Sequence, residues 1–378
     1  MYRRERSVPL RGSSLALYNN LAVLPLPAKR LTYFASVHGA SVGLVSAAAD
    51  GAGCAHRQLQ AREGGLGPPI VTQVRRGREG GARGGSGGHP RLRQKRCPLA
   101  GGLVRVALAD AAGAGLMEGH PGEPREMYEP DGSAMVYWHA LDGMEASAGM
   151  LLFARGIAGT GLHFVCVGTS TGSVLVFDVP AKGTNITLSE VLEQHSAPSR
   201  TSAQSSVSSR NCNGHPVYPL LQEGAADLVT ADDSGALCVW GSGETFRLIT
   251  KIPAADCTCS SVKLWNGVIA AGYGNGQICL YEAAHGILRA QVSAHARWIY
   301  ALDLAPLSGK LLSAAEDSFV RVWGLSHNAD TDSLEITHCH TECVTDTQLC
   351  GARFCNPEGT AFAVTGFELN EIILYHQV

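Results

Sequence analysis

The sequence lacks the features of a membrane protein and of a secreted protein. It contains no run of about 18 apolar residues, which excludes a typical transmembrane helix. Arg3, Arg4 and Arg6 stand near the N-terminus, but no long apolar stretch follows them, as it would in a signal peptide. The net charge is only −3, which argues against a general role in binding nucleic acids or membrane surfaces. We therefore expect a cytoplasmic protein.

The sequence also lacks a recognisable catalytic site. It contains no Gly-x-Ser-x-Gly, no phosphate-binding P-loop and no His-Glu-x-x-His. Gly272, Gly274 and Gly276 resemble part of a dinucleotide-binding loop, but they lie between two expected strands, whereas that motif requires a following helix. Asp232 and Asp233 are neighbours in an expected turn, where adjacent side chains usually point apart. We therefore expect a non-enzymatic protein without a cofactor.

Cysteine is plentiful, yet its arrangement matches neither a disulfide framework nor a metal site. Three of the 12 cysteines, Cys166, Cys238 and Cys279, fall inside expected strands, where a free thiol behaves as a small apolar side chain. Another group is close in sequence and consists of His338, Cys339, His340, Cys343, Cys350 and Cys355. Zinc ligands usually come in pairs on a turn, whereas these residues follow an expected loop and strand. We therefore expect no metal site and a reducing compartment.

The sequence does contain a hairpin pattern that recurs five times. In the clearest copy, Leu311 to Trp323, two short apolar stretches flank Asp317 and Ser318, which are typical turn residues. Each copy has a small residue nine positions before a closing aromatic, a turn former five before it, and aliphatic residues three and one before it. The closing aromatics are Phe177, Trp240, Tyr281, Trp323 and Tyr375. Their spacings of 63, 41, 42 and 52 residues indicate a repeat architecture.

This pattern resembles the blades of the WD-repeat β-propeller family. In that family a blade carries a His before its first strand, a Ser or Thr on the second, an Asp in the next turn and a Trp on the third. His295, Ser313, Asp317 and Trp323 stand at those places. The resemblance implies that they form a buried chain of hydrogen bonds, which we call the relay. Other copies keep only parts of this set, with candidates at Thr230, Thr365, His195 and His340.

The resemblance covers roughly residues 1–74 and 127–378 and implies an all-β fold. We expect a single β-propeller over residues 1–378, with seven blades of four antiparallel strands. The blade-like units are 30–69, 70–142, 143–195, 196–253, 254–295, 296–340 and 341–378. The last unit ends three residues after Tyr375 and lacks a fourth strand. We expect an N-terminal strand within Ser14–Leu26 to complete it and to close the ring.

One range departs from the repeat. Residues 75–126 are low in complexity, and 75–96 alone hold seven Gly and eight Lys or Arg. The blade at 70–142 needs its second and third strands here, but the hairpin signature is absent. Three interpretations stay open: a disordered insertion, an Arg/Gly-rich RNA-binding segment, and a stretch that is not native coding sequence. Against RNA binding, residues 75–126 contain no aromatic side chain to stack on bases.

The function that these patterns favour is a non-enzymatic scaffold that presents a rigid propeller face to partner proteins. The alternative is an RNA-binding protein acting through residues 75–96. Trp, Tyr and Arg are common interface anchors, and we look for the binding face where the His and Asp loops meet. The candidate residues are Arg297, Trp298, Tyr273, Asn275, Glu316, Asp232 and Asp233. The sequence does not identify the partner proteins, and it leaves self-association open.

Overall fold

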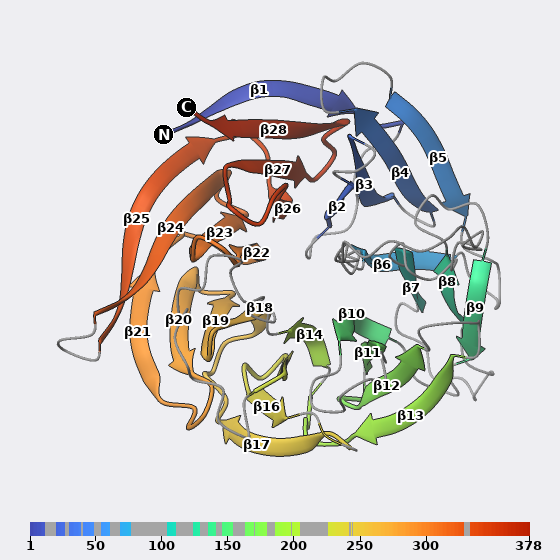
Figure 1. The fold of residues 1–378 in the computed structure, drawn as a ribbon, viewed down its shortest axis with the longest axis vertical. Coiled ribbons are helices and arrows are strands. Elements are labelled where there is room, and N and C mark those ends of the chain that lie inside the picture. Colours follow the sequence, from blue (N-terminus) through green and yellow to red (C-terminus); the bar gives the residue numbers. More distant parts are fainter. Residues whose placement is uncertain are drawn as a thin grey trace, which may run out of the picture.

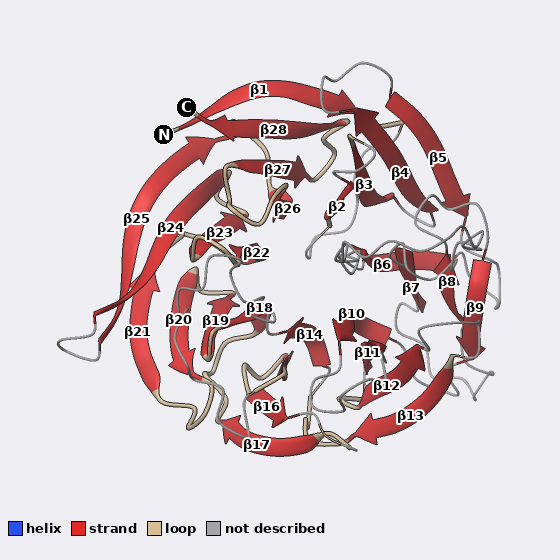
Figure 2. Cartoon of the chain, viewed as in Figure 1, coloured by secondary structure: helices blue, strands red, loops and turns tan. Residues whose placement is uncertain are grey.

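The protein, in a computed structural model, is a ring of β-sheets (Figures 1 and 2). The structure describes residues 1–11, 20–26, 30–38, 41–48, 54–60, 69–76, 104–110, 124–128, 135–140, 146–153, 163–169, 171–179, 186–197, 199–204, 226–241, 243, 245–328 and 333–378. All elements of regular secondary structure in these ranges are β-strands. These described residues contain no helix long and apolar enough to cross a membrane.

Within the described ranges, twenty-eight strands form seven four-stranded sheets, which we number as blades 1 to 7. Blades 1 and 2 consist of β2 (Ala22–Leu26), β3 (Leu31–His38), β4 (Ser41–Ala48), β5 (Cys54–Gln60), β6 (Pro69–Arg76), β7 (Val104–Asp110), β8 (Pro124–Tyr128) and β9 (Met135–Ala140). Blades 3 and 4 consist of β10 (Ala146–Phe153), β11 (His163–Thr169), β12 (Val174–Val179), β13 (Thr187–Leu192), β14 (Ser199–Gln204), β15 (Leu228–Asp232), β16 (Leu237–Gly241) and β17 (Arg247–Ile252).

The remaining strands build the three blades nearest the C-terminus. Blades 5 and 6 consist of β18 (Cys259–Trp265), β19 (Val268–Tyr273), β20 (Gln277–Glu282), β21 (Leu288–Ser293), β22 (Ile299–Ala305), β23 (Lys310–Ala315), β24 (Phe319–Asn328) and β25 (Ser333–Cys343). Blade 7 consists of β26 (Leu349–Phe354), β27 (Ala361–Gly366), β28 (Glu371–Gln377) and β1 (Tyr2–Pro9).

The strand order confirms the predicted β-propeller. Within each of blades 1 to 6, four consecutive strands pair antiparallel from the centre of the ring to its rim. The inner strands of these radial sheets are almost fully buried, as in β15 and β26, whereas the outer strand β17 is mostly exposed. Small and aliphatic residues therefore fill the second and third strands, because neighbouring blades pack face to face close to the axis.

The turn position of the hairpin signature has a backbone reason. Gly172, Gly235, Gly276 and Ser318 occupy it in four blades, and all four have positive φ angles, of 90°, 84°, 82° and 68°. Glycine adopts this conformation without a steric penalty. At Gly276 a Cβ atom would also collide with the backbone carbonyl of His295. The signature therefore marks the turn that brings the second strand, the third strand and the next loop together.

The ring closes through a strand from the N-terminal region, but not the one expected. β1 pairs antiparallel with β28, from Tyr2 opposite Gln377 to Pro9 opposite Glu371. The expected segment Ser14–Leu26 instead contributes β2, the innermost strand of blade 1. The prediction of its location was wrong because β1 shows little strand periodicity, with only two of its eight side chains buried.

The range 75–126 supplies two strands that its sequence does not signal. β7 and β8 are the second and third strands of blade 2, and they pair with β6 and β9 on either side. The absence of a hairpin signature was therefore a poor guide to the backbone here. Residues 77–103 and 111–123 lie outside the described residues, so the expected disorder of this range stays a prediction.

Candidate interaction face

The structure brings the four relay residues of blade 6 together. The Trp323 indole Nε1 donates to Ser313 Oγ at 2.9 Å, and Ser313 Oγ lies 2.8 Å from His295 Nε2. On the other side of the imidazole, Nδ1 lies 3.0 Å from Asp317 Oδ1 and 3.1 Å from Oδ2. The chain of hydrogen bonds thus starts on the third strand of the blade and passes through the second strand to the loop that precedes the blade. It ends at the turn between the second and third strands.

One arrangement of protons satisfies every member of this relay. The indole N–H donates to the hydroxyl oxygen, the hydroxyl donates to Nε2, and the Nδ1 proton is donated to the Asp317 carboxylate. Burial lowers the pKa of His295 from its ordinary value, against the raising effect of Asp317. Burial acts to raise the pKa of Asp317, but the hydrogen bonds from His295 and from two backbone amides outweigh it and lower this pKa. The His295 imidazole is therefore neutral, and the Asp317 carboxylate is charged.

Blade 4 contains a second complete relay. Its His195 Nδ1 lies 2.9 Å from Asp232 Oδ2, and Nε2 lies 2.7 Å from Thr230 Oγ1. The Trp240 indole Nε1 donates to the same hydroxyl at 3.0 Å. Ser234, not an Asp, stands as many residues before Trp240 as Asp317 stands before Trp323. The carboxylate comes instead from the end of β15, and it also accepts hydrogen bonds from Ser234.

Blade 7 keeps the hydroxyl but has no relay. Thr365 Oγ1 donates to the backbone carbonyl of Asn20 at 3.0 Å, in the approach to blade 1. His340, the sequence candidate for its imidazole, lies on the outer strand of blade 6 and faces Glu342 at 2.8 Å and the ring of Tyr2 at 5.3 Å. That assignment was wrong, because His340 belongs to a strand and not to the loop before a blade.

The two relays lie beneath one continuous surface, which we call the relay face. It comprises the turns and loops at 233–236, 253–258, 274–276, 294–298, 316–318 and 344–348. Hydrogen bonds join these segments in order: the Thr258 hydroxyl donates to the Asp233 carbonyl, and the Gly274 amide donates to the Thr258 carbonyl. The amides of His295 and Val344 bond to the carbonyls of Gly276 and Ser318. The surface is therefore held in one shape from blade 4 to blade 7.

Four of the predicted binding residues reach this surface in blades 5 and 6. Arg297 has a side chain 67% exposed and lies 3.6 Å from the Glu316 carboxylate. Asn275 is exposed and accepts the Gln277 backbone amide in its own turn. Trp298 is half-buried, and its ring lies over Gly274, where any side chain would collide with it. Arg297, Trp298, Asn275 and Glu316 thus come from neighbouring segments of blades 5 and 6.

Two predicted binding residues are not on the surface at all. Tyr273 is 2% exposed and its hydroxyl lies 3.2 Å from that of Tyr281 in the core, so burial raises its pKa. Asp232 is fully buried in the relay of blade 4. Both assignments are corrected: an aromatic or a carboxylate beside a turn glycine can be the last residue of the buried strand. Asp233 is half-buried on the relay face.

A charged belt on the innermost strands was not found from the sequence. Lys263, Asp303 and Arg353 occupy the same position, the fifth residue, of β18, β22 and β26. Asp303 Oδ1 lies 3.1 Å from Lys263 Nζ and 2.8 Å from Arg353 Nη1, and Arg353 Nε donates to the Leu21 carbonyl of the chain entering blade 1. Burial acts to raise the pKa of Asp303, but the two cations hold it well below its usual range. The sequence signal that could have revealed this belt is the shared position of the three charged residues, each the fifth residue of its strand.

The His and Cys residues grouped at 338–355 in the sequence are not gathered into one metal site in this described part of the chain. Among the described residues no group of three or more His, Cys, Asp or Glu side chains is placed to hold a metal ion. Cys339 and Cys343 are exposed on β25, whereas Cys350 is buried on β26, so the cysteine cluster is spread over two blades. Burial raises the pKa of Cys350 to about 12, which keeps that thiol protonated.

Comparison with known proteins identifies close relatives. A family model described as WDR54 matches residues 1–77 and 116–378. The chain is 51% identical to WD repeat-containing protein 54 of Mus musculus and 51% identical to that of Homo sapiens, over the full length of this chain and of each relative. Among solved structures, a chain of "Crystal Structure of Mitotic Checkpoint Complex" matches with a TM-score of 0.65 and 14% identity, covering 99% of this chain and 91% of that one. This last match shows the fold alone.

The gap in the family match coincides with the unusual range of the sequence. The model leaves out residues 78–115, which lie inside 75–126. The predicted resemblance is confirmed on both sides of the gap.

Proposed function

We propose that this chain, which belongs to the WDR54 family, is a non-enzymatic scaffold that binds partner proteins through the relay face. A propeller of this family is suited to holding loops in fixed positions, and loops on a rigid framework are common binding sites. We place the protein in the cytoplasm.

The observation that carries this proposal is the pairing of two complete relays with an exposed cluster beside them. Each relay ties a loop between blades to the turn of the next blade, in blades 4 and 6. Arg297 and Trp298 follow the relay histidine of blade 6 after Ala296, whose backbone amide donates to Asp317 Oδ2, so the loop that carries them is held to the relay before any partner arrives. A preorganised surface loses little conformational entropy on binding, and Arg and Trp are the side chains that most often dominate interface energetics.

The experiment compares partners recovered with the wild type and with Arg297→Glu, quantified by mass spectrometry. The matched control is Arg247→Glu, because Arg247 carries the same charge and is also exposed but lies on the outer strand of blade 4. We expect at least one partner to lose more than tenfold in recovery with Arg297→Glu and to stay unchanged with the control. Equal recovery with all three proteins would reject the relay face as the binding surface.

The RNA-binding alternative acts through residues 75–96, which lie outside the described residues except for 75 and 76. It predicts a different salt response, because binding to phosphates releases counterions and weakens steeply with salt. Deleting 77–96 and titrating single-stranded RNA at 50 and 200 mM salt distinguishes it from the scaffold proposal.

A further inference from the structure

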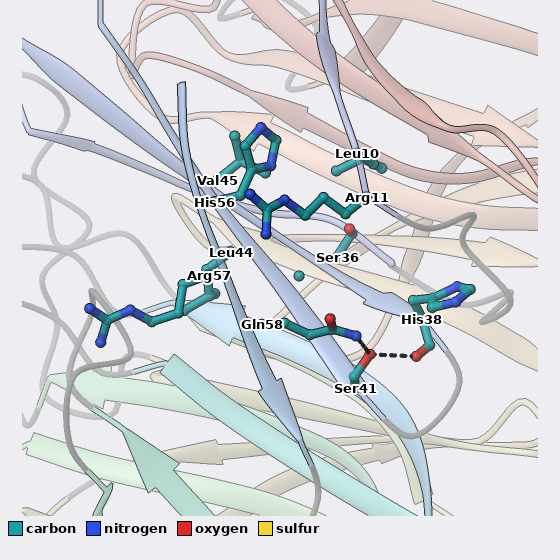
Figure 3. A pocket seen from close by; sticks show the side chains of 11 residues that line it. Leu10, Arg11, Ser36, His38, Ser41, Leu44, Val45, His56, Arg57 and Gln58 are labelled. Atoms are coloured by element: carbon teal, nitrogen blue, oxygen red, sulfur yellow. Dashed lines mark hydrogen bonds between the residues drawn. The ribbon is translucent and has the colours of Figure 1, made fainter. Parts of the chain in front are cut away.

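The small pocket of blade 1 is lined by polar side chains that do not converge. It has a volume of about 30 Å³ and mostly apolar walls, contributed by the chain after β1 and by β3, β4 and β5 (Figure 3). Gln58 Nε2 donates to Ser41 Oγ at 2.7 Å, and Ser41 Oγ donates to the His38 carbonyl at 2.9 Å, so these groups bind one another. In Figure 3 the Arg57 side chain extends away from the pocket. The relay face offers more to a partner, because its charge is concentrated.

The relay face is strongly acidic. Its described segments contain five carboxylates, against Arg297 as the one guanidinium and His295 as a neutral imidazole. The whole chain has a net charge of only −3, so the rest of the molecule is close to neutral. The carboxylates belong to Asp233, Asp256, Glu316, Asp317 and Asp346. A surface with this charge attracts basic partners and repels nucleic acids and anionic membranes.

Three loops that enter successive blades carry charges of alternating sign. Asp256, Arg297 and Asp346 stand three, two and three residues before the innermost strands β18, β22 and β26, and all three residues are exposed. Blades 5, 6 and 7 follow one another around the ring (Figure 1). The relay face therefore presents a negative, a positive and a negative side chain in this order.

The two flanking carboxylates are not used by the protein itself. In the described part of the chain neither the Asp256 nor the Asp346 carboxylate forms a hydrogen bond or an ion pair. Hydrogen bonds of Thr258 and Val344 anchor the loops that carry them. The two aspartates have φ angles of 53° and 54°, in the left-handed region that Gly, Asn and Asp adopt most readily. Two exposed carboxylates on anchored loops are therefore available to the cations of a partner.

We propose, on the basis of the scaffold function proposed above, that the relay face binds a segment of a partner protein in which two basic residues flank an acidic one. The basic residues pair with Asp256 and Asp346, and the acidic residue pairs with Arg297. The contact of Arg297 with Glu316, at 3.6 Å, is too long for a hydrogen bond and leaves its N–H donors for a partner. This order of charges rejects other partners, because like charges placed opposite one another cost free energy.

The test uses fluorescent peptides of the form Lys-Glu-Lys, with glycine spacers of two to six residues between the charges. A second set has the reversed charges, Glu-Lys-Glu, and a third set has the first composition in the order Lys-Lys-Glu. Binding to the full chain is measured by fluorescence anisotropy at low salt, where charge pairs are weakly screened. We expect the best Lys-Glu-Lys peptide to bind at least tenfold more tightly than any peptide of the other two sets.

The variant Asp256→Asn/Asp346→Asn should lose at least fivefold of this affinity. Asparagine keeps the shape of the side chain and tolerates the left-handed backbone, but it carries no charge. The control is Glu358→Lys, because it changes the net charge of the chain by the same amount but lies in the exposed turn between β26 and β27, at the other end of these strands. The control should bind within twofold of the wild type, and both variants should melt at the wild-type temperature.

Equal affinity for the three peptide sets would overturn the proposal, and so would the absence of binding by all of them. An equal loss in the variant and in its control would overturn it too, since long-range attraction alone would then account for binding. The scaffold function is tested separately by Arg297→Glu. A partner that is lost with Arg297→Glu but retained by Asp256→Asn/Asp346→Asn would leave the scaffold function intact and overturn this order of charges.

Discussion

Blades 6 and 7 are neighbours built on the same hairpin, yet they are stabilised in different ways. Blade 6 relies on a buried polar relay, with His295 in the loop before it and Asp317 in its turn. Blade 7 has Thr347 and Leu369 at the corresponding places, so neither an imidazole nor a carboxylate is present. Its third strand carries Tyr375, which stacks on Phe362 with ring centroids 4.8 Å apart.

The outer strands of the two blades differ as well. In blade 6 all four strands follow one another in the chain, whereas blade 7 takes its outer strand, β1, from the other end of the sequence. Tyr2 anchors that strand: its hydroxyl donates to the Gly359 carbonyl, Lys310 Nζ donates to the hydroxyl at 3.2 Å, and burial raises the pKa of Tyr2 to about 12. A relay stabilises one loop and one turn, while the closing strand stabilises the whole ring.

The largest expected effect is on blade 7. Deletion of residues 1–9 removes β1 and exposes the edge of β28, so the ring loses its closing sheet. We expect the melting temperature to fall by about 10 °C or more and the protein to self-associate, measured by calorimetry and light scattering. Arg3→Ala, which keeps the strand, should change neither quantity. An unchanged melting temperature after the deletion would show that the ring is stable without closure.

The next effect is on the relay of blade 6. Asp317→Ala leaves the His295 Nδ1 proton and two backbone amides without their acceptor, and should lower the free energy of unfolding by about 2–3 kcal/mol. Chemical denaturation measures this, with Glu316→Ala as the neighbouring control, expected below about 0.5 kcal/mol. The double variant with His295→Ala should be less destabilised than the sum of the single variants. Strict additivity would contradict a coupled relay.

The same reasoning separates the two aspartates of blade 4. Asp232→Ala should destabilise the protein by about 2–3 kcal/mol, because this carboxylate is fully buried and accepts from His195, Ser234 and Ala236. Asp233→Ala should cost less, since Asp233 is only half-buried. Chemical denaturation of both variants ranks them, and the reverse order would show that the relay carboxylate has been misassigned.

Acid should weaken the relay blades and leave blade 7 untouched. Burial lowers the pKa of His195 and of His295 below the ordinary value of 6.5, so the unfolded chain binds protons that the folded chain resists. The contribution of the two neutral histidines to the free energy of unfolding is therefore fully present above pH 6.5. It decreases as the pH falls below this value, by up to about 1.4 kcal/mol per pH unit for each histidine. Unfolding curves from pH 7.5 to 5.5 measure the slope, which should be shallower in the variant His295→Gln.

The smallest effect is expected from the hydroxyl of blade 7. Thr365→Val removes one hydrogen bond to the Asn20 carbonyl while keeping the side-chain shape, and should cost about 0.5–1.5 kcal/mol. Ser313→Ala in blade 6 should cost more, because Trp323 and His295 both lose a partner. Equal losses in the two variants would remove the distinction between a relay hydroxyl and an isolated one.

The parts of the fold that the sequence predicted are those with local patterns. The hairpin signature depends on a turn, a bulky aromatic and alternating apolar residues, all within ten positions, and it located five blades. The relay of blade 6 followed from the same spacing. In blade 4 the relay histidine lies before β14, much further from Trp240 than His295 lies from Trp323, and its aspartate sits two residues earlier than the repeat suggests.

The parts that the sequence did not predict depend on distant contacts. β1 has exposed or half-exposed side chains at six of its eight positions, because an outer strand is covered on one edge only. The burial of Tyr273 and Asp232 depends on how neighbouring loops cover the ends of their strands. The belt of Lys263, Asp303 and Arg353 joins three blades, and each of its members looks like an isolated charge in the sequence.

The pairing of β1 with β28 also sets an order of events during synthesis. About 360 residues separate Pro9 from Glu371, and ribosomes add about 5–20 residues per second, so β1 waits about 20–70 s for its partner. Until then β1 has no β28 to pair with. Arg3, Arg4 and Arg6 give it the charges that discourage strand-to-strand aggregation while translation continues.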